Sequence, residues 1–219
     1  MSGKYNAGYI MDVLTWEQTR LVFVVYCSAL TPLFAIPYLH YRQVIPAWVL
    51  PVYISTFVVC ALGWELWFNY GIIAGDSVDV RRALGLTQRL PLHLNWILNS
   101  LADAGSISCG GLLAVWLISG RNRVLFSHWR HWVFLCLLFL FIGQNILVEM
   151  FLYHDQLEVG KPLSWAPLSP FGPWWNPVLF EFQGRTVTLQ GQLPWLLMTP
   201  LFYAGVLAYL RRAPLGKAD

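Results

Sequence analysis

Five long runs of apolar residues constrain this chain more than any other feature of its sequence. A helix that crosses the hydrocarbon core of a bilayer needs about 20 mostly apolar residues, and its backbone must satisfy its own hydrogen bonds there. The runs comprise residues 21–38, 47–70, 94–119, 132–153 and 193–210. The sequence therefore predicts an all-α, polytopic membrane protein whose residues 1–219 form a single membrane domain.

The composition agrees with this prediction. The chain of 219 residues is 57% hydrophobic and 11% charged, with a mean hydropathy of +0.53, whereas soluble domains carry about 25% charged residues. Its net charge of +3 is modest, and the basic residues lie in the connections, which argues against nucleic-acid binding. The four cysteines each fall in a different apolar run and form no CxxC pair, which favours free thiols.

The connection between the fourth and fifth runs, residues 154–192, has a distinct character. It contains Trp165, Trp174 and Trp175 together with several prolines, and tryptophan is favoured at the membrane interface. Two β-prone stretches, residues 178–182 and 185–189, flank a Gln-Gly pair, the pattern of a short hairpin. We predict an interfacial cap over residues 154–192 that contains a β-hairpin and lies over the polar ends of the helices.

Five spans place the two termini on opposite sides of the membrane. The two sides carry equal numbers of Lys and Arg. Charge in long loops counts less for orientation, and this discounts Lys161 and Arg185 on the N-terminal side. We therefore expect the C-terminus to be cytoplasmic.

Polar residues interrupt the second, third and fourth runs. Asn95, Asn99 and Asp103 follow one another at i, i+4 spacing, with Ser106 and Gly110 continuing the line, so that all five share one face of an α-helix.

The polar residues of the three runs are expected to lie at the same depth. Helices alternate in direction, so the end of the second span, the start of the third and the end of the fourth share one leaflet. The residues placed there are Glu65, Asn95, Asn99, Asp103, Asn145 and Glu149. Hydrogen bonding between helices accounts for any one of them alone, but their convergence favours a functional pocket.

The three acids in these runs are costly to place in lipid. An ionised carboxylate at the centre of a spanning helix costs about 2.5–3.5 kcal/mol on insertion scales. No Lys or Arg lies inside a run to pair with Glu65, Asp103 or Glu149. We therefore expect at least one of the three to carry a proton at neutral pH.

A protonated acid in an aromatic cavity can start carbocation chemistry. It donates a proton to an alkene or epoxide, aromatic faces stabilise the cation, and a second carboxylate removes a proton. The candidate catalytic residues are Glu65, Asp103 and Glu149. The candidate substrate-binding residues are Trp64, Trp67, Asn95, Trp96, Asn99, Asn145, Tyr153 and His154. Trp and Tyr also gather at interfaces in any membrane protein, so each aromatic residue taken singly has that second explanation.

The sequence offers no metal or cofactor motif. Its five histidines are scattered, and the boxes of histidines that diiron membrane enzymes need are absent. We expect neither metal nor cofactor. The expected partners are a lipid-soluble small molecule and membrane lipid, with further protein subunits left open.

The stretch ALGWELWFNYG, with Trp64-Glu65-Leu66 late in the second run, resembles a motif of the integral membrane terpene cyclases of fungal meroterpenoid pathways. That resemblance implies that Glu65 is the proton donor. The family is read as seven helices with a second acid in the last, whereas this chain has five runs and no acid in its last. The architecture is also similar to the five-helix sterol isomerase (emopamil-binding) class.

The leading hypothesis is a membrane enzyme that cyclises or isomerises a lipid-soluble isoprenoid by acid–base chemistry. One alternative is a non-catalytic subunit that binds a pigment, quinone or lipid in a larger complex. A second alternative is a proton or ion pathway, which intramembrane acids often mark. Confinement of the polar residues to one leaflet argues against a pathway.

Overall fold

The computed structural model describes residues 13–72, 76–122, 124–152, 173–182 and 185–212. Five helical segments dominate it, and each is long and apolar enough to cross a membrane. The prediction of five helices of spanning length is therefore confirmed. The first is α1 (Trp16–Tyr41), the fourth α8 (His131–Phe151) and the fifth α9 (Leu189–Arg212). The second consists of α2 (Val49–Leu62) and α3 (Trp64–Tyr70), and the third of α6 (Leu92–Ala102), η1 (Asp103–Cys109) and α7 (Gly110–Ile118).

Short elements connect these segments at one end of the bundle. The helices α4 (Val78–Arg81) and α5 (Leu84–Arg89) join the second segment to the third. A 3-10 turn, η4 (Pro173–Trp175), precedes the antiparallel strands β1 (Val178–Phe182) and β2 (Arg185–Thr188). The predicted hairpin is therefore confirmed, except that Leu189 begins α9 instead of ending the second strand.

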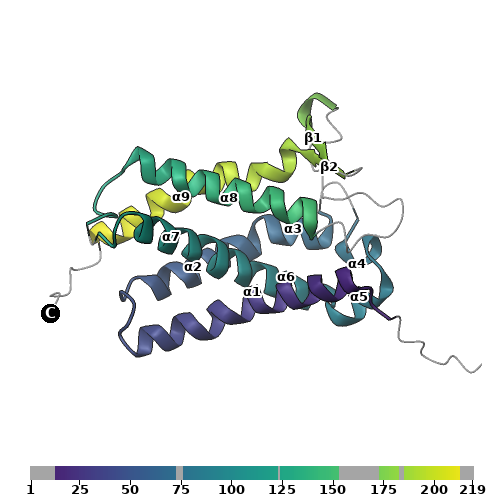
Figure 1. The fold of residues 1–219 in the computed structure, drawn as a ribbon, viewed down its shortest axis with the longest axis horizontal. Coiled ribbons are helices and arrows are strands. Elements are labelled where there is room, and N and C mark those ends of the chain that lie inside the picture. The colour runs from purple at the N-terminus through teal and green to yellow at the C-terminus, as the bar shows by residue number, and fades with distance from the viewer. Residues whose placement is uncertain (1–12, 73–75, 123, 153–172, 183–184, 213–219) are drawn as a thin grey trace, which may run out of the picture.

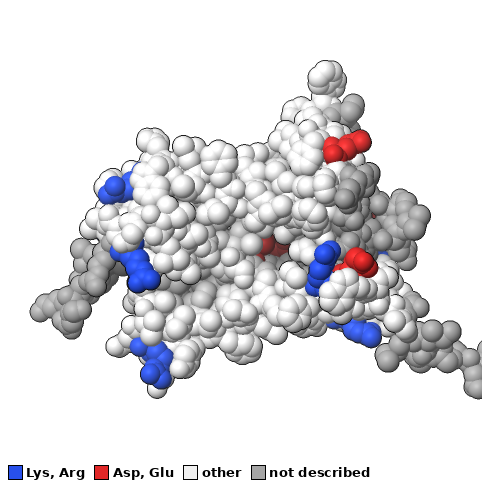
Figure 2. Space-filling view, viewed as in Figure 1, with Lys and Arg blue, Asp and Glu red and all other residues white. Residues whose placement is uncertain are grey.

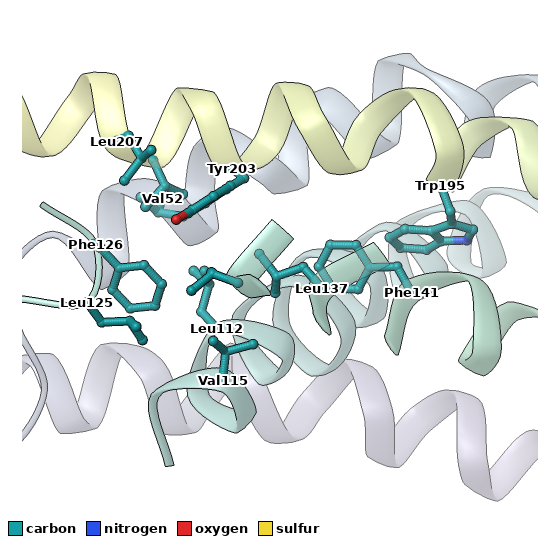
Figure 3. Packing of buried hydrophobic residues seen from close by; sticks show 12 residues of the cluster. Val52, Leu112, Val115, Leu125, Phe126, Leu137, Phe141, Trp195, Tyr203 and Leu207 are labelled. Carbon is teal, nitrogen blue, oxygen red and sulfur yellow. The ribbon is translucent and has the colours of Figure 1, made fainter. Parts of the chain in front are cut away.

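The segments form two groups. Helices α8 and α9 pack along each other, whereas α1 packs against α6 and η1, and α2 packs against η1. Figure 1 shows α8 and α9 together at the top, with α1, α2 and α6 beneath them. A cluster of buried apolar side chains extends from Trp195, beside Trp64 of α3, to Leu125 and Phe126 at the opposite end of the bundle, and ten of its members are labelled in Figure 3. Tyr203 and Leu137 in this cluster are fully buried.

Two helices begin four or five residues earlier than the apolar runs predict. The first run starts at residue 21, but α1 starts at Trp16 because Thr15 and Gln18 form a capping box. The backbone N–H of Gln18 donates to Thr15 Oγ1 at 3.2 Å, and the backbone N–H of Thr15 donates to Gln18 Oε1 at 3.1 Å. The fifth run starts at residue 193, but α9 already starts at Leu189.

The early start of α9 corrects the limits of the predicted cap. Residues 189–192 belong to the first turn of α9, not to the connection. Gln190 and Gln192 are polar but almost fully buried, and a hydropathy criterion excludes them because it assumes that polar residues lie outside the span. Trp165 lies outside the described residues, whereas Trp174 and Trp175 are exposed.

The second and third segments are not continuous α-helices. Gly63 separates α2 from α3, and a Cβ at this position would lie against the Val59 carbonyl oxygen. In the third segment, Asp103–Cys109 adopt π-helical geometry, which is rare and often found at functional sites. The expectation that one α-helical face carries the polar line through Ser106 and Gly110 is therefore wrong beyond Asp103.

The π-helical segment fits closely against a proline in α1. Pro32 has no N–H, so the carbonyl of Ser28, four residues earlier, lacks its usual helical donor. Ser106 Oγ donates to that carbonyl oxygen at 2.7 Å. The absence of a side chain at Gly105 lets the two backbones approach, because a Cβ there would collide with the Pro32 ring.

We predict that Gly105→Ala destabilises the protein. The added methyl would overlap the Pro32 ring and approach Tyr53, and overpacking of this kind costs about 1–3 kcal/mol. The matched control is Gly143→Ala in α8, where a Cβ meets nothing within 4 Å. Reversible unfolding in mixed detergent micelles measures both variants, and equal stability of the two would contradict the close contact.

Candidate functional site

A cavity of about 200 Å³ lies among the five helical segments. Its walls include Val24 of α1, Phe68 of α3, Asn99 of α6, Gln144 of α8 and Pro194 of α9. Figure 2 shows acidic atoms at the bottom of an opening in the middle of the displayed face, and in Figure 1 that place lies between α1 and α8. Residues of both helices line the cavity.

Glu65 enters this cavity from the first turn of α3. Its side chain is only 3% exposed. The Asn69 amide, one turn later, donates from Nδ2 to Glu65 Oε2 at 2.9 Å, and Asn99 also hydrogen-bonds this carboxyl group. Both partners are neutral amides, and within the described part of the chain no cation contacts Glu65 directly.

Asp103 lies beside Glu65 and comes from the third segment. It is the first residue of the π-helical η1 and remains partly exposed to the cavity. The indole Nε1 of Trp64 donates to Asp103 Oδ2 at 2.7 Å. Trp64 is the residue immediately before Glu65, so its hydrogen bond to Asp103 brings the two carboxyl groups to the same wall of the cavity.

Glu149 lies across the cavity on α8 and is 3% exposed. Gln192 donates from Nε2 to Glu149 Oε2 at 3.0 Å, and Asn145 approaches Oε1 at 3.4 Å. Asn145 also donates to Gln192 Oε1 at 2.9 Å, which closes a small network. The carboxyl group lies against Gly191, where a Cβ would collide with it.

Aromatic rings form the wall next to Asp103. Trp64 and Trp195 have ring centroids 5.3 Å apart, and Phe141 lies 5.3 Å beyond Trp195. Trp195 is 4% exposed and lines the cavity with Trp64. Indole faces attract cations more strongly than other aromatic faces do, so this wall suits a ligand that develops positive charge.

A buried arginine lies behind Glu65, outside the spanning segments. Arg82 follows α4, is 2% exposed and donates from NH1 to Asn95 Oδ1 at 3.2 Å. It also donates to the carbonyl oxygen of Leu90. Burial lowers the pKa of the Arg82 guanidinium to about 10, against a smaller opposing effect of Asp79. The guanidinium therefore stays charged at neutral pH.

Six of the predicted site residues line the cavity. They are Trp64, Glu65, Asn99, Asp103, Asn145 and Glu149. The structure thus brings the three acids together, while their roles stay predictions. The predicted substrate-binding residues Tyr153 and His154 lie outside the described residues.

Three other predicted residues do not line the cavity. Asn95 is buried and bonds Asn69, whose Oδ1 accepts its amide at 2.6 Å. Trp96 donates from Nε1 to the Ala61 carbonyl oxygen at 2.8 Å. Ala61 belongs to the last turn of α2, where carbonyls lose their helical donors, so Trp96 supports the break between α2 and α3. Trp67 lies on α3 outside the lining.

The sequence reasoning missed several residues of the site. Gln190, Gly191 and Trp195 line the cavity, and Gln192 bonds Glu149. One feature of the sequence could have identified them. Gln190 and Gln192 come just before the fifth apolar run, at the end of that run that shares a leaflet with the acids. The described residues of the hairpin do not line the cavity. Residues 154–172 of the predicted cap lie outside the described residues.

Among the described residues, no group of three His, Cys, Asp or Glu side chains is arranged to hold a metal ion. Comparison with protein-family models, with characterised proteins and with solved structures found no match for this chain. The cavity itself therefore carries the argument about function.

We predict that Gln192→Leu destabilises the fold. The change removes a donor from the buried Glu149 and an acceptor from Asn145, and a buried polar group without its partner costs about 1–3 kcal/mol. The matched control is Gln144→Leu in the same cavity, whose amide bonds only the Phe141 carbonyl of its own helix among the described contacts. Unfolding in mixed micelles should show the larger loss for Gln192→Leu, and an equal or larger loss for the control would contradict the network.

Proposed function

We propose that this protein is a multi-pass membrane enzyme that cyclises or isomerises a lipid-soluble isoprenoid by acid–base chemistry. One observation carries the proposal: the carboxyl groups of Glu65 and Asp103 line the same cavity beside the indoles of Trp64 and Trp195. Two close carboxyl groups in an apolar site hold one proton between them more readily than they both ionise. Such a pair contains an acid and a base together.

The proposed reaction begins when the protonated carboxyl group gives its proton to an alkene or epoxide of the substrate. A new C–H or O–H bond forms, and a carbocation develops beside Trp64 and Trp195, whose faces stabilise it. The cation is attacked by a neighbouring double bond in a cyclase, or it loses a proton directly in an isomerase. The carboxylate of the pair takes the proton that leaves, so the enzyme ends with the same number of protons.

The cavity suits a substrate that reaches it from the lipid. About 200 Å³ is below the range of roughly 300–1,000 Å³ typical of pockets that enclose a drug-sized ligand. It can therefore enclose the reacting end of a long isoprenoid, while the tail extends through the opening between α1 and α8. Val24 of α1 and Val148 of α8 supply apolar side chains to the cavity. Near the ends of these helices, Arg20 of α1 donates to the carbonyl oxygen of Phe151 of α8 at 2.9 Å.

The two alternative functions explain fewer features of the structure than the enzyme does. A proton or ion pathway needs polar groups across the whole bundle, but the half away from α3 is filled by apolar side chains such as Leu112, Val115 and Leu137 (Figure 3). A pigment- or quinone-binding subunit would use the same cavity without needing two adjacent acids. Co-purification of a coloured ligand without any turnover would favour that subunit.

We also propose that the C-terminal end of the bundle faces the cytoplasm. The described residues there include five arginines and no acid, and the basic end is visible at the left of Figure 2. These arginines are Arg42, Arg121, Arg130, Arg211 and Arg212. At the other end, Arg81 and Arg82 are buried and so have a structural role, which strengthens the positive-inside argument.

We predict that Glu65→Gln and Asp103→Asn each abolish turnover of a polyprenyl alkene and epoxide mixture in proteoliposomes. General acid–base catalysis contributes about 10²–10⁴-fold, and neither amide can give or take the proton. Glu17→Gln, the same chemical change at an exposed position of α1, is the control and should leave turnover unchanged. Products are measured by gas chromatography with mass spectrometry. Wild-type product levels in both pocket variants would rule out the acid–base mechanism.

We predict that Val24→Trp and Val148→Trp, combined, block access from the lipid. Phosphatidylcholine with a diazirine in its acyl chain should cross-link to cavity residues in the wild-type protein. Peptide mass spectrometry should show that this labelling falls at least tenfold in the double variant. Ile54→Trp, at an exposed position of α2, is the control. Undiminished labelling in the double variant would show that the lipid does not enter between α1 and α8.

A further inference from the structure

A chain of hydrogen bonds runs from Glu65 in the cavity to Arg82 outside the spanning segments. Asn69 donates from Nδ2 to Glu65 Oε2 at 2.9 Å, and Asn95 donates from Nδ2 to Asn69 Oδ1 at 2.6 Å. Arg82 donates from NH1 to Asn95 Oδ1 at 3.2 Å. All four residues are buried, with 3% exposure or less. Two amides thus link a carboxyl group to a guanidinium that it does not touch.

Both ends of the chain fix its direction. Asn69 Nδ2 also donates to the backbone carbonyl of Glu65 at 2.8 Å, and a carbonyl can only accept, so the amide nitrogen must face Glu65. The guanidinium of Arg82 can only donate, so the oxygen of Asn95 must face Arg82. The middle bond then runs from Asn95 to Asn69, in agreement with both ends.

This direction matters for the charge on Glu65. Every donor in the chain points away from the cation and toward the carboxyl group, so both amide dipoles present their positive ends to Glu65. Aligned hydrogen bonds in a low-dielectric interior polarise one another. Asp103 has a different environment, because its described hydrogen bond comes from the indole of Trp64, which is not linked to a cation in this way.

We propose that Arg82 is a positioning residue that acts through Asn95 and Asn69 to hold Glu65 as the ionised member of the Glu65–Asp103 pair. This assignment rests on the proposed function and gives each carboxyl group of the pair one role. Asp103 gives the proton, and Glu65 takes it. The order is the reverse of the one that the Trp-Glu-Leu resemblance implies.

Other charged groups lie near the pair and near Arg82. Asp103 of η1 faces Glu65, and Glu149 of α8 lies across the cavity from both. Arg82 lies near Asp79 and Arg81 of α4. The negative charge of Asp79 supports the charge on Arg82, and its carboxylate accepts a hydrogen bond from Ser77.

The proton balance of a turnover follows from this assignment. The O–H bond of Asp103 breaks as a C–H bond forms on the substrate alkene. A C–H bond next to the cation then breaks, its electron pair forms the product double bond, and Glu65 gains the proton. Transfer of that proton from Glu65 back to the adjacent Asp103 restores the pair, so no oxidant, reductant or external acid is consumed.

Infrared spectroscopy on the purified protein in nanodiscs at pH 7 tests the assignment without any substrate. A protonated carboxyl group has a C=O stretching band that a carboxylate lacks and that shifts in D₂O. We expect this band to lose one component in Asp103→Asn and to be unchanged in Glu65→Gln. Loss of a component in Glu65→Gln would overturn the assignment.

A second set of variants interrupts the chain while keeping the fold. Asn95→Asp retains the size of the side chain and pairs directly with Arg82, but its carboxylate cannot donate to Asn69. We expect it to add a protonated component that disappears in the Glu65→Gln/Asn95→Asp double variant. Arg82→Met should add the same component, and Arg82→Lys should restore most of the wild-type spectrum.

The matched control is Asn122→Asp, the same change at an exposed position at the other end of the bundle, which should leave the spectrum unaltered. A wild-type-like Glu65 signal in folded Asn95→Asp and Arg82→Met would overturn the role of Arg82. The turnover assay is independent of these spectra. Expected spectra with no turnover would therefore reject the enzyme and retain the coupling between Arg82 and Glu65.

Discussion

Buried carboxyl groups need hydrogen-bond partners, and this requirement organises one half of the molecule. A polar group in an apolar interior costs several kcal/mol unless it is bonded. Glu65 and Glu149 each receive amide donors, and Asp103 receives an indole donor. Helices α3, α6, α8 and α9 must therefore converge at one depth, and the cavity forms where their polar side chains meet. Among the described residues, the other half of the bundle contains no buried carboxyl group and packs as an apolar core.

Irregular backbone accompanies the same site. The break at Gly63 separates Trp64 and Glu65 from α2, and the π-helical turn begins at Asp103. Each irregularity frees backbone groups, and buried backbone groups need other hydrogen-bond partners. Trp96 bonds the Ala61 carbonyl near the first break, and Ser106 bonds the carbonyl that Pro32 leaves without a donor. The polar and aromatic residues that the sequence suggests for a pocket thus form two groups. Some face the cavity, and others hydrogen-bond backbone carbonyls that the irregular helices leave without a donor.

That division explains how far the sequence could predict the site. Apolar length identified the five helices, and their alternating direction predicted from sequence alone that Glu65, Asp103 and Glu149 lie at one depth. Nothing in the spacing distinguishes Asn99, which lines the cavity, from Asn95, which lies behind it. The π-helical turn also changes which side of the third segment the residues after Asp103 face. A prediction from α-helical periodicity assumes a regular helix and cannot show this change.

The limits of the helices were missed for a related physical reason. Hydropathy treats a polar residue as solvated, but Gln190 and Gln192 are buried because α8 supplies their partners. Tertiary contacts of this kind lie outside any single run of sequence.

The connection between α3 and α6 has a larger part in the site than its polarity suggests. It lies outside the apolar runs and has the composition of a surface loop, yet Arg81 and Arg82 are almost fully buried. Arg81 donates to the Phe68 carbonyl at 2.9 Å and lies over the Phe68 ring. Both arginines therefore contact the polar layer at the end of α3. A cation placed outside the spans avoids the cost of a charge within them, and two amides carry its influence to Glu65. In this arrangement the connection becomes part of the electrostatic environment of the cavity.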